Sequence, residues 1–203
     1  MTIKSLQSTS LTNNIFYRSM LAGNDAFFPE SESDDFLEEV VLTTSASSVT
    51  FSGLASYATA GYKHLQVRAL TRTDNNSALD NLYVQLNGDS GANYAKHELF
   101  GDGSTVYSGA SANYSQMTWL YTQGATETSG VFSPTVLDLL DFSSTTKNTT
   151  LRGSSAWVGG TKRLAFHSGL WMNTAAVTSI TFTPHDGNNI VAGTRISLYG
   201  SKG

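Results

Sequence analysis

The feature that most constrains the fold is a succession of short segments in which apolar and polar residues alternate. In SITFTP, for example, Ile180 and Phe182 alternate with Thr181 and Thr183. A period of two is the repeat of a β-strand that buries one face and exposes the other. The segments that we predict as strands are 36–43, 48–54, 64–70, 82–88, 95–101, 115–122, 134–142, 149–158, 163–172, 179–184 and 195–200.

The connections between these segments carry the residues that tight turns require. They include NGDSGAN (87–93), GDGST (101–105), VGGT (158–161) and HDGNN (185–189), in which Gly and Asn can supply positive φ angles. No long amphipathic helix is predicted. Many short strands separated by turns are typical of a β-sandwich or a barrel. We predict an all-β fold over residues 31–203, an antiparallel β-sandwich built as a jelly roll with additional strands.

The first 30 residues lack this alternation. Their apolar residues are scattered among Ser, Thr and Asn, and they are Ile3, Leu6, Leu11, Ile15, Phe16, Met20 and Leu21. We predict that residues 1–30 form an extended N-terminal arm whose apolar side chains bind a partner protein, with one short helix over 13–22. The acidic run SESDD (31–35) is then a solvated linker. The alternative is that this segment is an edge strand of the sandwich itself.

The charge of the chain argues against electrostatically driven binding. Charged residues make up 14% of the sequence, against about 25% in an average globular domain, and the formal net charge is −4 with no basic block. We therefore expect no binding to nucleic acid or to an anionic membrane. No apolar stretch suits a secretory signal or a membrane span. The expected location is the cytoplasm of the producing cell, unless a larger particle carries the protein out.

Residues that could hold a metal show no suitable pattern. The sequence contains no cysteine, which excludes disulfides, thiolate ligands and a cysteine nucleophile. The histidines His64, His97, His167 and His185 lack the spacing of a metal site, and we interpret each of them as structural.

Carboxylates offer two further possibilities. Glu38 with Glu39, and Asp138 with Asp141, could serve glycoside hydrolysis if either pair faced a cleft, but neither has a catalytic signature. We interpret all four as strand-end or turn residues.

Two glycine-rich loops could hold calcium through Asp89 and Asp102, but a calcium loop needs several oxygen ligands and each loop has one acid. Nucleotide-binding and nucleophile-elbow motifs are absent from the sequence. We predict no catalytic residue, no cofactor and no metal.

Aromatic residues are the remaining candidates for binding. Trp119 and Trp171 lie in otherwise apolar segments, so we predict that both belong to the core. Tyr107 and Tyr114 lie in the Gly/Ser-rich stretch 107–115 and are predicted as exposed contacts, because tyrosine offers a large contact area at low entropic cost.

Several segments resemble a family of virion structural proteins from phages of marine and freshwater bacteria, including cyanophages. They are IKSLQSTSLTNNIFYRSMLAGN (3–24), YKHLQVRALTRTD (62–74), NGDSGANYAKHELFGDGST (87–105), VLDLLDFSSTTKNTTLRG (136–153) and the stretch 167–203. The resemblance covers most of the chain. It implies a non-enzymatic structural protein on the exterior of a tailed-phage virion, assembled in the host cytoplasm, whose partners are the major capsid protein or tail proteins.

Within a virion, the predicted arm favours a capsid decoration or cement protein. A tail-fibre or receptor-binding component is the first alternative, and a carbohydrate-binding module is the second. We also expect a symmetric homo-oligomer and predict a trimer, because copies of the chain can cover strand edges and apolar loops such as VFSP (131–134).

Overall fold

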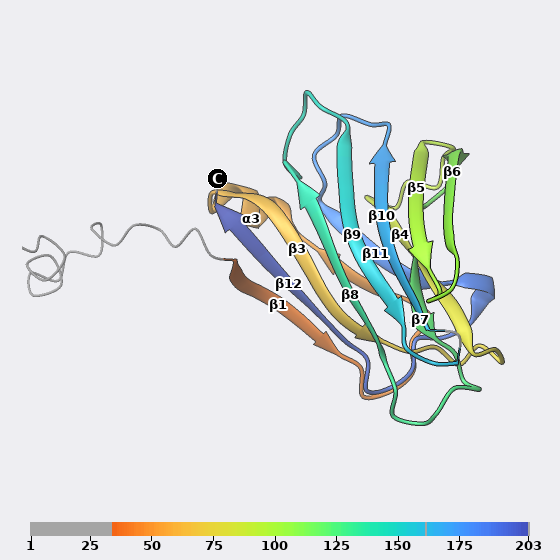
Figure 1. Ribbon diagram of the computed structural model, residues 1–203. Coiled ribbons are helices and arrows are strands. Elements are labelled where there is room, and N and C mark those ends of the chain that lie inside the picture. Colours follow the sequence, from red (N-terminus) through yellow and green to blue (C-terminus); the bar gives the residue numbers. More distant parts are fainter. Residues whose placement is uncertain (1–33, 161, 203) are drawn as a thin grey trace, which may run out of the picture. The chain divides into compact units, whose positions relative to one another are not determined.

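The computed structural model describes residues 34–160 and 162–202, apart from the side chains of Thr118 and Trp119. These residues form two antiparallel sheets that pack face to face as a sandwich (Figure 1). The predicted arm, its contact residues from Ile3 to Leu21 and the helix predicted over 13–22 lie outside the described residues.

The larger of the two sheets, called the large sheet below, has eight strands. In spatial order they are β1 (Asp35–Val41), β12 (Arg195–Lys202), β3 (Tyr62–Thr71), β8 (Ser133–Leu140), β9 (Thr149–Trp157), β10 (Arg163–Trp171), β5 (Tyr94–Gly101) and β6 (Val106–Tyr114). Figure 1 looks onto this sheet, with β1 at one edge and β6 at the other.

The small sheet has four strands, β2 (Val49–Ser52), β11 (Ser179–Pro184), β4 (Leu79–Leu86) and β7 (Met117–Gln123). Two short helical segments, α3 (Ala55–Thr59) and the 3₁₀ turn η2 (His185–Gly187), complete the elements of the described residues. No helix in this part of the chain is long and apolar enough to cross a membrane.

The connectivity is that of a jelly roll with two inserted hairpins. Without β5–β6 and β9–β10, the sheets reduce to the orders β1-β12-β3-β8 and β2-β11-β4-β7. Each successive strand then lies in the other sheet, except that β7 follows β4 within the small sheet. Two such four-stranded sheets are the jelly-roll arrangement. The two hairpins extend only the large sheet. The predicted jelly roll with additional strands is therefore confirmed.

Every segment predicted as a strand overlaps a strand of the structure, but β6 was not predicted. Its sequence, VYSGASANY, does not alternate, and eight of its nine residues are exposed, Ser111 being half-buried. A strand without a buried face leaves no period-two signal, because the pairing with β5 rests on the backbone.

The core lies between the sheets and is filled by the inward positions of both. Phe51 and Phe182 meet edge to face with ring centroids 6.5 Å apart, and both are fully buried. Trp171 is also buried, as predicted from its apolar segment, and it stacks on Tyr94 at 6.4 Å. The side chain of Trp119, the other tryptophan predicted in the core, lies outside the described part.

The acidic run before β1 is less of a free linker than predicted, at least at its described end. Asp34 accepts a hydrogen bond of 2.7 Å from Nη2 of Arg68, and Asp35, the first residue of β1, accepts one of 2.9 Å from the hydroxyl of Tyr62. Both acids are thus tied to β3.

Candidate functional site

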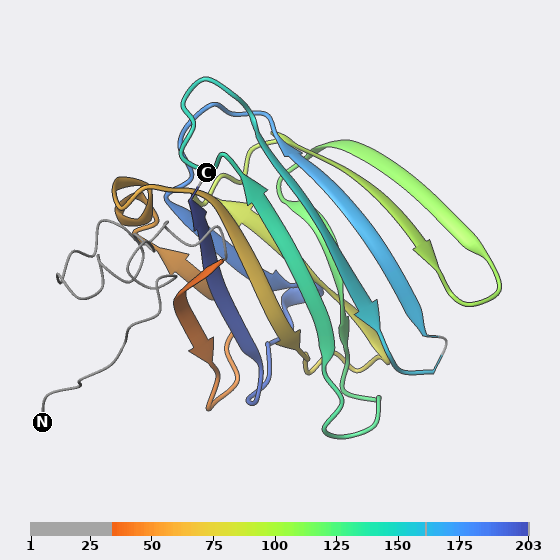
Figure 2. The same ribbon diagram turned by 60° about the vertical axis from the view of Figure 1, so that its left-hand side comes forward.

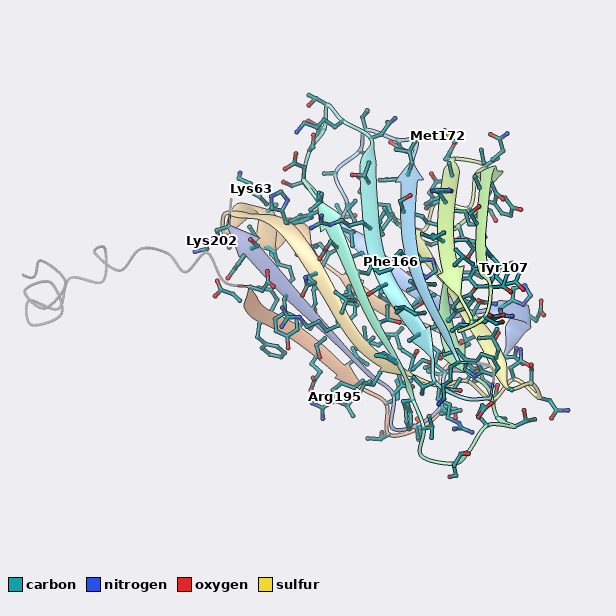
Figure 3. All side chains as sticks on the ribbon, in the orientation of Figure 1. Lys63, Tyr107, Phe166, Met172, Arg195 and Lys202 are labelled. Carbon is teal, nitrogen blue, oxygen red and sulfur yellow. The ribbon has the colours of Figure 1, made fainter. Side chains whose placement is uncertain are left out.

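The outer face of the large sheet, turned away from the small sheet, exposes an unusual number of apolar side chains. Successive residues of a strand point to opposite faces of the sheet. The side chains of the outer face are therefore the alternate residues of each strand that do not point toward the small sheet. Nine large hydrophobic residues are exposed at outward positions, namely Phe36, Val41, Leu70, Leu99, Val106, Val136, Leu140, Leu164 and Phe166. Phe166 is 58% exposed, and it lies in the middle of the face in Figure 3.

Strand register aligns some of these residues into a row. Val136 of β8 lies opposite Ser154 of β9, Ser154 lies opposite Phe166 of β10, and Phe166 lies opposite Leu99 of β5. These four residues are called the apolar row below. Directly opposite side chains on one face are in contact distance, so the row is a continuous surface across four strands.

A second row lies beside it and is polar. It consists of Tyr199, Gln66, Asp138 and Arg152, which face one another across β12, β3, β8 and β9. The Asp138 carboxylate accepts hydrogen bonds from Nε2 of Gln66 at 2.8 Å and from Nε of Arg152 at 3.0 Å. This set is called the polar row.

Arg68 connects the polar row to the edge of the sheet. Its guanidinium lies 4.1 Å from the centre of the Tyr199 ring, its Nε donates to Gln66 at 2.6 Å, and its Nη2 donates to Asp34. The polar side chains of this face therefore already have partners, and a protein that covers the face leaves few of their charges unpaired.

An open hollow of about 330 Å³ lies where the two rows meet. Its lining includes Val136, Asp138, Arg152, Ser154 and Phe166. Aromatic and arginine side chains with few lysines are typical of protein interfaces. The outward positions of the described large sheet include Arg68, Arg152 and Arg195, so this face is suited to binding a macromolecule.

Tyr107 and Tyr114, the contacts predicted from sequence, lie on β6 and are 44% and 40% exposed. Both are on the inward side of the sheet. Tyr107 stacks on Phe100 at 4.8 Å, and the Tyr114 ring lies 5.9 Å from Nζ of Lys96. Their predicted exposure is confirmed, but they do not join the outer face; their role as contacts stays a prediction.

Sequence reasoning missed the apolar row, although one signal was present. In RLAFHSGLW, Leu164 and Phe166 share one side of the strand while Ala165 lies on the other. A strand that is apolar on both sides predicts two covered faces, and only one of them faces the small sheet.

In each of the two carboxylate pairs that could have served glycoside hydrolysis, the two side chains bind different partners. Glu38 accepts from the hydroxyl of Tyr57 at 3.4 Å, whereas Glu39 accepts from the hydroxyl of Ser197 at 2.8 Å. Asp138 belongs to the polar row, and Asp141 forms an ion pair with Lys147. Neither pair is arranged around a shared cleft.

The acids of the two glycine-rich loops are used as hydrogen-bond acceptors. Asp89 accepts from Nε1 of Trp171 at 2.7 Å, from Nδ2 of Asn93 at 2.9 Å and from the backbone N–H of Gly91 at 2.8 Å. These bonds, above all that from Trp171, lower the pKa of Asp89.

Asp102 in the same way accepts from the backbone N–H groups of Ser104 and Thr105. In the described part of the chain, no group of three or more His, Asp or Glu side chains could hold a metal ion.

A buried polar cluster lies between the sheets near β7. Oγ of Ser155 is 2.8 Å from Nε2 of His167, and it accepts a hydrogen bond of 2.9 Å from the backbone N–H of Tyr121. Burial, with the nearby charge of Lys96, lowers the pKa of His167 to about 4. A serine next to a neutral histidine resembles an activated nucleophile, but both residues are at least 96% buried, so a substrate cannot reach them.

The other histidines lie apart from this cluster. His64 accepts a hydrogen bond of 3.0 Å from the backbone N–H of Asp141, His185 contacts Asp186 at 2.7 Å, and His97 is exposed on the outer face of β5. The structure does not bring them together.

No protein-family model matches the sequence, and no curated protein and no solved structure shows a significant similarity to it. The outer face of the large sheet is therefore the feature of the molecule that bears most directly on function.

Proposed function

We propose that this protein is a non-enzymatic structural component of a phage virion, a capsid decoration protein that binds its neighbour through the outer face of the large sheet. The observation that carries the proposal is the apolar row beside the polar row, in a chain with few charged residues. The resemblance of several segments to virion structural proteins supplies the biological setting.

The energetics favour binding at this face. Burying a large apolar side chain contributes about 1.5–3 kcal/mol, and Phe166, Leu99 and Val136 are each 38–58% exposed without a partner. Part of that gain is offset by the cost of association. A decoration protein binds at many equivalent sites of a shell, so a moderate affinity at each site is sufficient.

The fold is compatible with this role by analogy only. Jelly rolls occur in viral capsid and lectin domains, among other classes, and a fold by itself does not specify a function. The inserted hairpins β5–β6 and β9–β10 bear directly on binding, because Phe166 and Leu99 lie on them and they widen the outer face beyond that of a minimal jelly roll.

The location is tested by purifying particles from lysates of the producing cells and measuring the protein by quantitative mass spectrometry. We expect a copy number comparable to that of the major capsid protein. A few copies per particle would indicate a tail component instead, and absence from purified particles would refute the proposal.

The binding face is tested by adding purified variants to particles that lack the protein. We expect Phe166→Asp to lose occupancy at least tenfold, because it places an unpaired charge in the middle of the apolar row. Met172→Asp is the matched control, since Met172 is exposed just after β10 and outside both rows. Equal occupancy of the two variants would exclude this face.

A second candidate function is glycan binding, as in a receptor-binding tail component. The exposed ring of Phe166 borders the hollow that Arg152, Asp138 and Ser154 also line, and sugars bind to such combinations of an aromatic surface with planar polar groups. Titration calorimetry with surface polysaccharide of the host tests it. Binding that Phe166→Ser abolishes, with unchanged occupancy on particles, would favour this candidate over decoration.

A further inference from the structure

The free edges of the two sheets are not equally protected against pairing with another chain. A strand at the edge of a sheet presents unpaired N–H and C=O groups, which natural proteins shield with charges, short strands, bulges or coverage. In the described residues the edges are formed by β1 and β6 in the large sheet and by β2 and β7 in the small sheet.

Three of these strands carry a recognisable protection. β1 contains Asp35, Glu38 and Glu39, so a second copy placed beside it would bring like charges together. β2 has only four residues.

β7 is shielded within the fold itself. Its backbone N–H at Tyr121 donates to Oγ of Ser155, and its carbonyl at Gln123 accepts from the N–H of Thr73 at 2.8 Å.

The outer edge of β6 lacks such protection over most of its length. The strand spans nine residues without a charge or a proline, and no described strand pairs with its outer side. A bulge interrupts its pairing with β5 only near the end, between the partners of Tyr94 and Lys96. The regular part is therefore Val106–Ser111. Figure 2 shows the β5–β6 hairpin, in green, at the end of the large sheet.

The hydrogen bond at the hairpin turn shows which backbone groups of β6 point outward. The N–H of Asp102 donates to the carbonyl of Thr105 at 3.2 Å, so these two residues form a hydrogen-bonded pair. Such pairs alternate with non-hydrogen-bonded ones in an antiparallel ladder. Tyr107, Gly109 and Ser111 consequently pair with β5. The backbone groups of the intervening residues, Val106, Ser108 and Ala110, face the free edge.

We propose that two copies of the chain form a two-fold symmetric dimer in which their β6 strands pair antiparallel, with the axis at Ser108. This register places Ser108 opposite Ser108 and Val106 opposite Ala110, and it uses every outward backbone group of the regular part. The two large sheets then form one continuous sheet. The strand that pairs with the free edge of β6 is β6 of a second copy, because an uncharged strand is complementary to itself in this register.

Side chains support the same register. Tyr107 lies opposite Gly109 of the second copy, and a glycine leaves room for a large ring across the strand pair. Tyr107 is already held against Phe100 by stacking, so little side-chain freedom is lost when the dimer forms. An aromatic residue that covers a glycine on the neighbouring strand is a favourable cross-strand pair.

The dimer is independent of the proposed virion role, since it uses an edge of the sheet and leaves the outer face open. It also differs from the trimer expected from sequence. An identical patch on both copies gives a closed two-fold contact, whereas a trimer needs two different patches.

The mass of the protein in solution tests the dimer by sedimentation equilibrium. We expect the wild type to weigh twice the chain mass of 21.7 kDa. Ser108→Lys should be a monomer, because two ammonium groups would meet at the two-fold axis. We expect this substitution to raise the dissociation constant of the dimer at least tenfold. Ser90→Lys, in an exposed loop, carries the same charge change and should remain a dimer. A wild-type monomer or trimer, or a dimer that Ser108→Lys leaves intact, would overturn the proposal.

A cross-link tests the register directly, and it remains informative if Ser108→Lys does not fold. Opposed residues of a hydrogen-bonded pair have Cα atoms about 5.5 Å apart, within the range of a disulfide. The chain has no cysteine of its own. Ser108→Cys should therefore form a covalent dimer under mild oxidation, and Ser90→Cys should not. Equal cross-linking of the two variants, or none at Ser108→Cys, would refute the register.

Discussion

Oγ of Ser155 and Nε2 of His167 lie 2.8 Å apart in the space between the two sheets, and the same Oγ accepts the backbone N–H of Tyr121 from β7. The serine thus fastens the edge of the small sheet to the large sheet, and the histidine holds the serine in place. This arrangement requires a neutral imidazole, since burial and the charge of Lys96 both oppose protonation.

The stability of the fold should therefore fall with acid before the carboxylates titrate. The pKa of His167 drops from its ordinary 6.5 to about 4 on folding. Between these values the unfolded chain binds a proton that the folded chain does not, so the free energy of unfolding decreases as the pH falls, by about 3 kcal/mol in total. Urea unfolding at a series of pH values measures this slope.

The matched variants for that measurement are His167→Gln and His64→Gln. His167→Gln should flatten the slope between pH 6.5 and 4, while His64→Gln, at a half-exposed site, should keep it. A slope that persists in His167→Gln would assign the acid sensitivity to another group.

The bond from Trp171 to Asp89 should be a strong local constraint. Asp89→Ala leaves the indole N–H of a fully buried tryptophan without its acceptor at 2.7 Å, and such a loss costs about 1–3 kcal/mol. Chemical denaturation measures it, with near-ultraviolet circular dichroism reporting on the ring. Asp102→Ala, whose hydrogen bonds stay within its own loop, should be milder. A larger effect at Asp102 would contradict this account.

Gly153 of β9 should not tolerate a side chain. A Cβ there would lie 2.4 Å from the carbonyl oxygen of Val136, which is backbone and cannot move aside. We expect Gly153→Ala to destabilise by about 1–3 kcal/mol, as overpacking does. Gly101→Ala is the control, because its Cβ would meet nothing nearer than 3.8 Å. Thermal melting compares the two, and equal melting temperatures would show that β9 can shift.

The polar row should matter less to stability than to binding. Asp138→Ala removes the acceptor of Gln66 and Arg152, but exposed pairs contribute only about 0–1 kcal/mol. We expect a nearly unchanged unfolding midpoint, with reduced occupancy on particles. A loss of several kcal/mol would instead make the row part of the structural framework.

Most strands could be predicted from the sequence, because a strand with one buried face alternates apolar and polar residues. Leu65 and Val67 of β3, or Ile180 and Phe182 of β11, are buried at alternate positions as expected. β6 escaped prediction because it buries neither face. Its strand conformation comes from pairing with β5, which is a property of the fold and not of the segment.

The outer face, by contrast, was assembled by the tertiary structure, although the two apolar sides of β10 gave one sign of it in the sequence. Val136 and Phe166 lie on β8 and β10, which are linked through β9, but Leu99 lies on β5, which is distant in sequence. Only the order β8-β9-β10-β5 brings all three into one row. Alternation tells which residues share a side of one strand, but it carries no information on which strands are neighbours or which face the small sheet covers. Those choices depend on long-range pairing and on the burial of the whole core, and therefore only the folded chain specifies them.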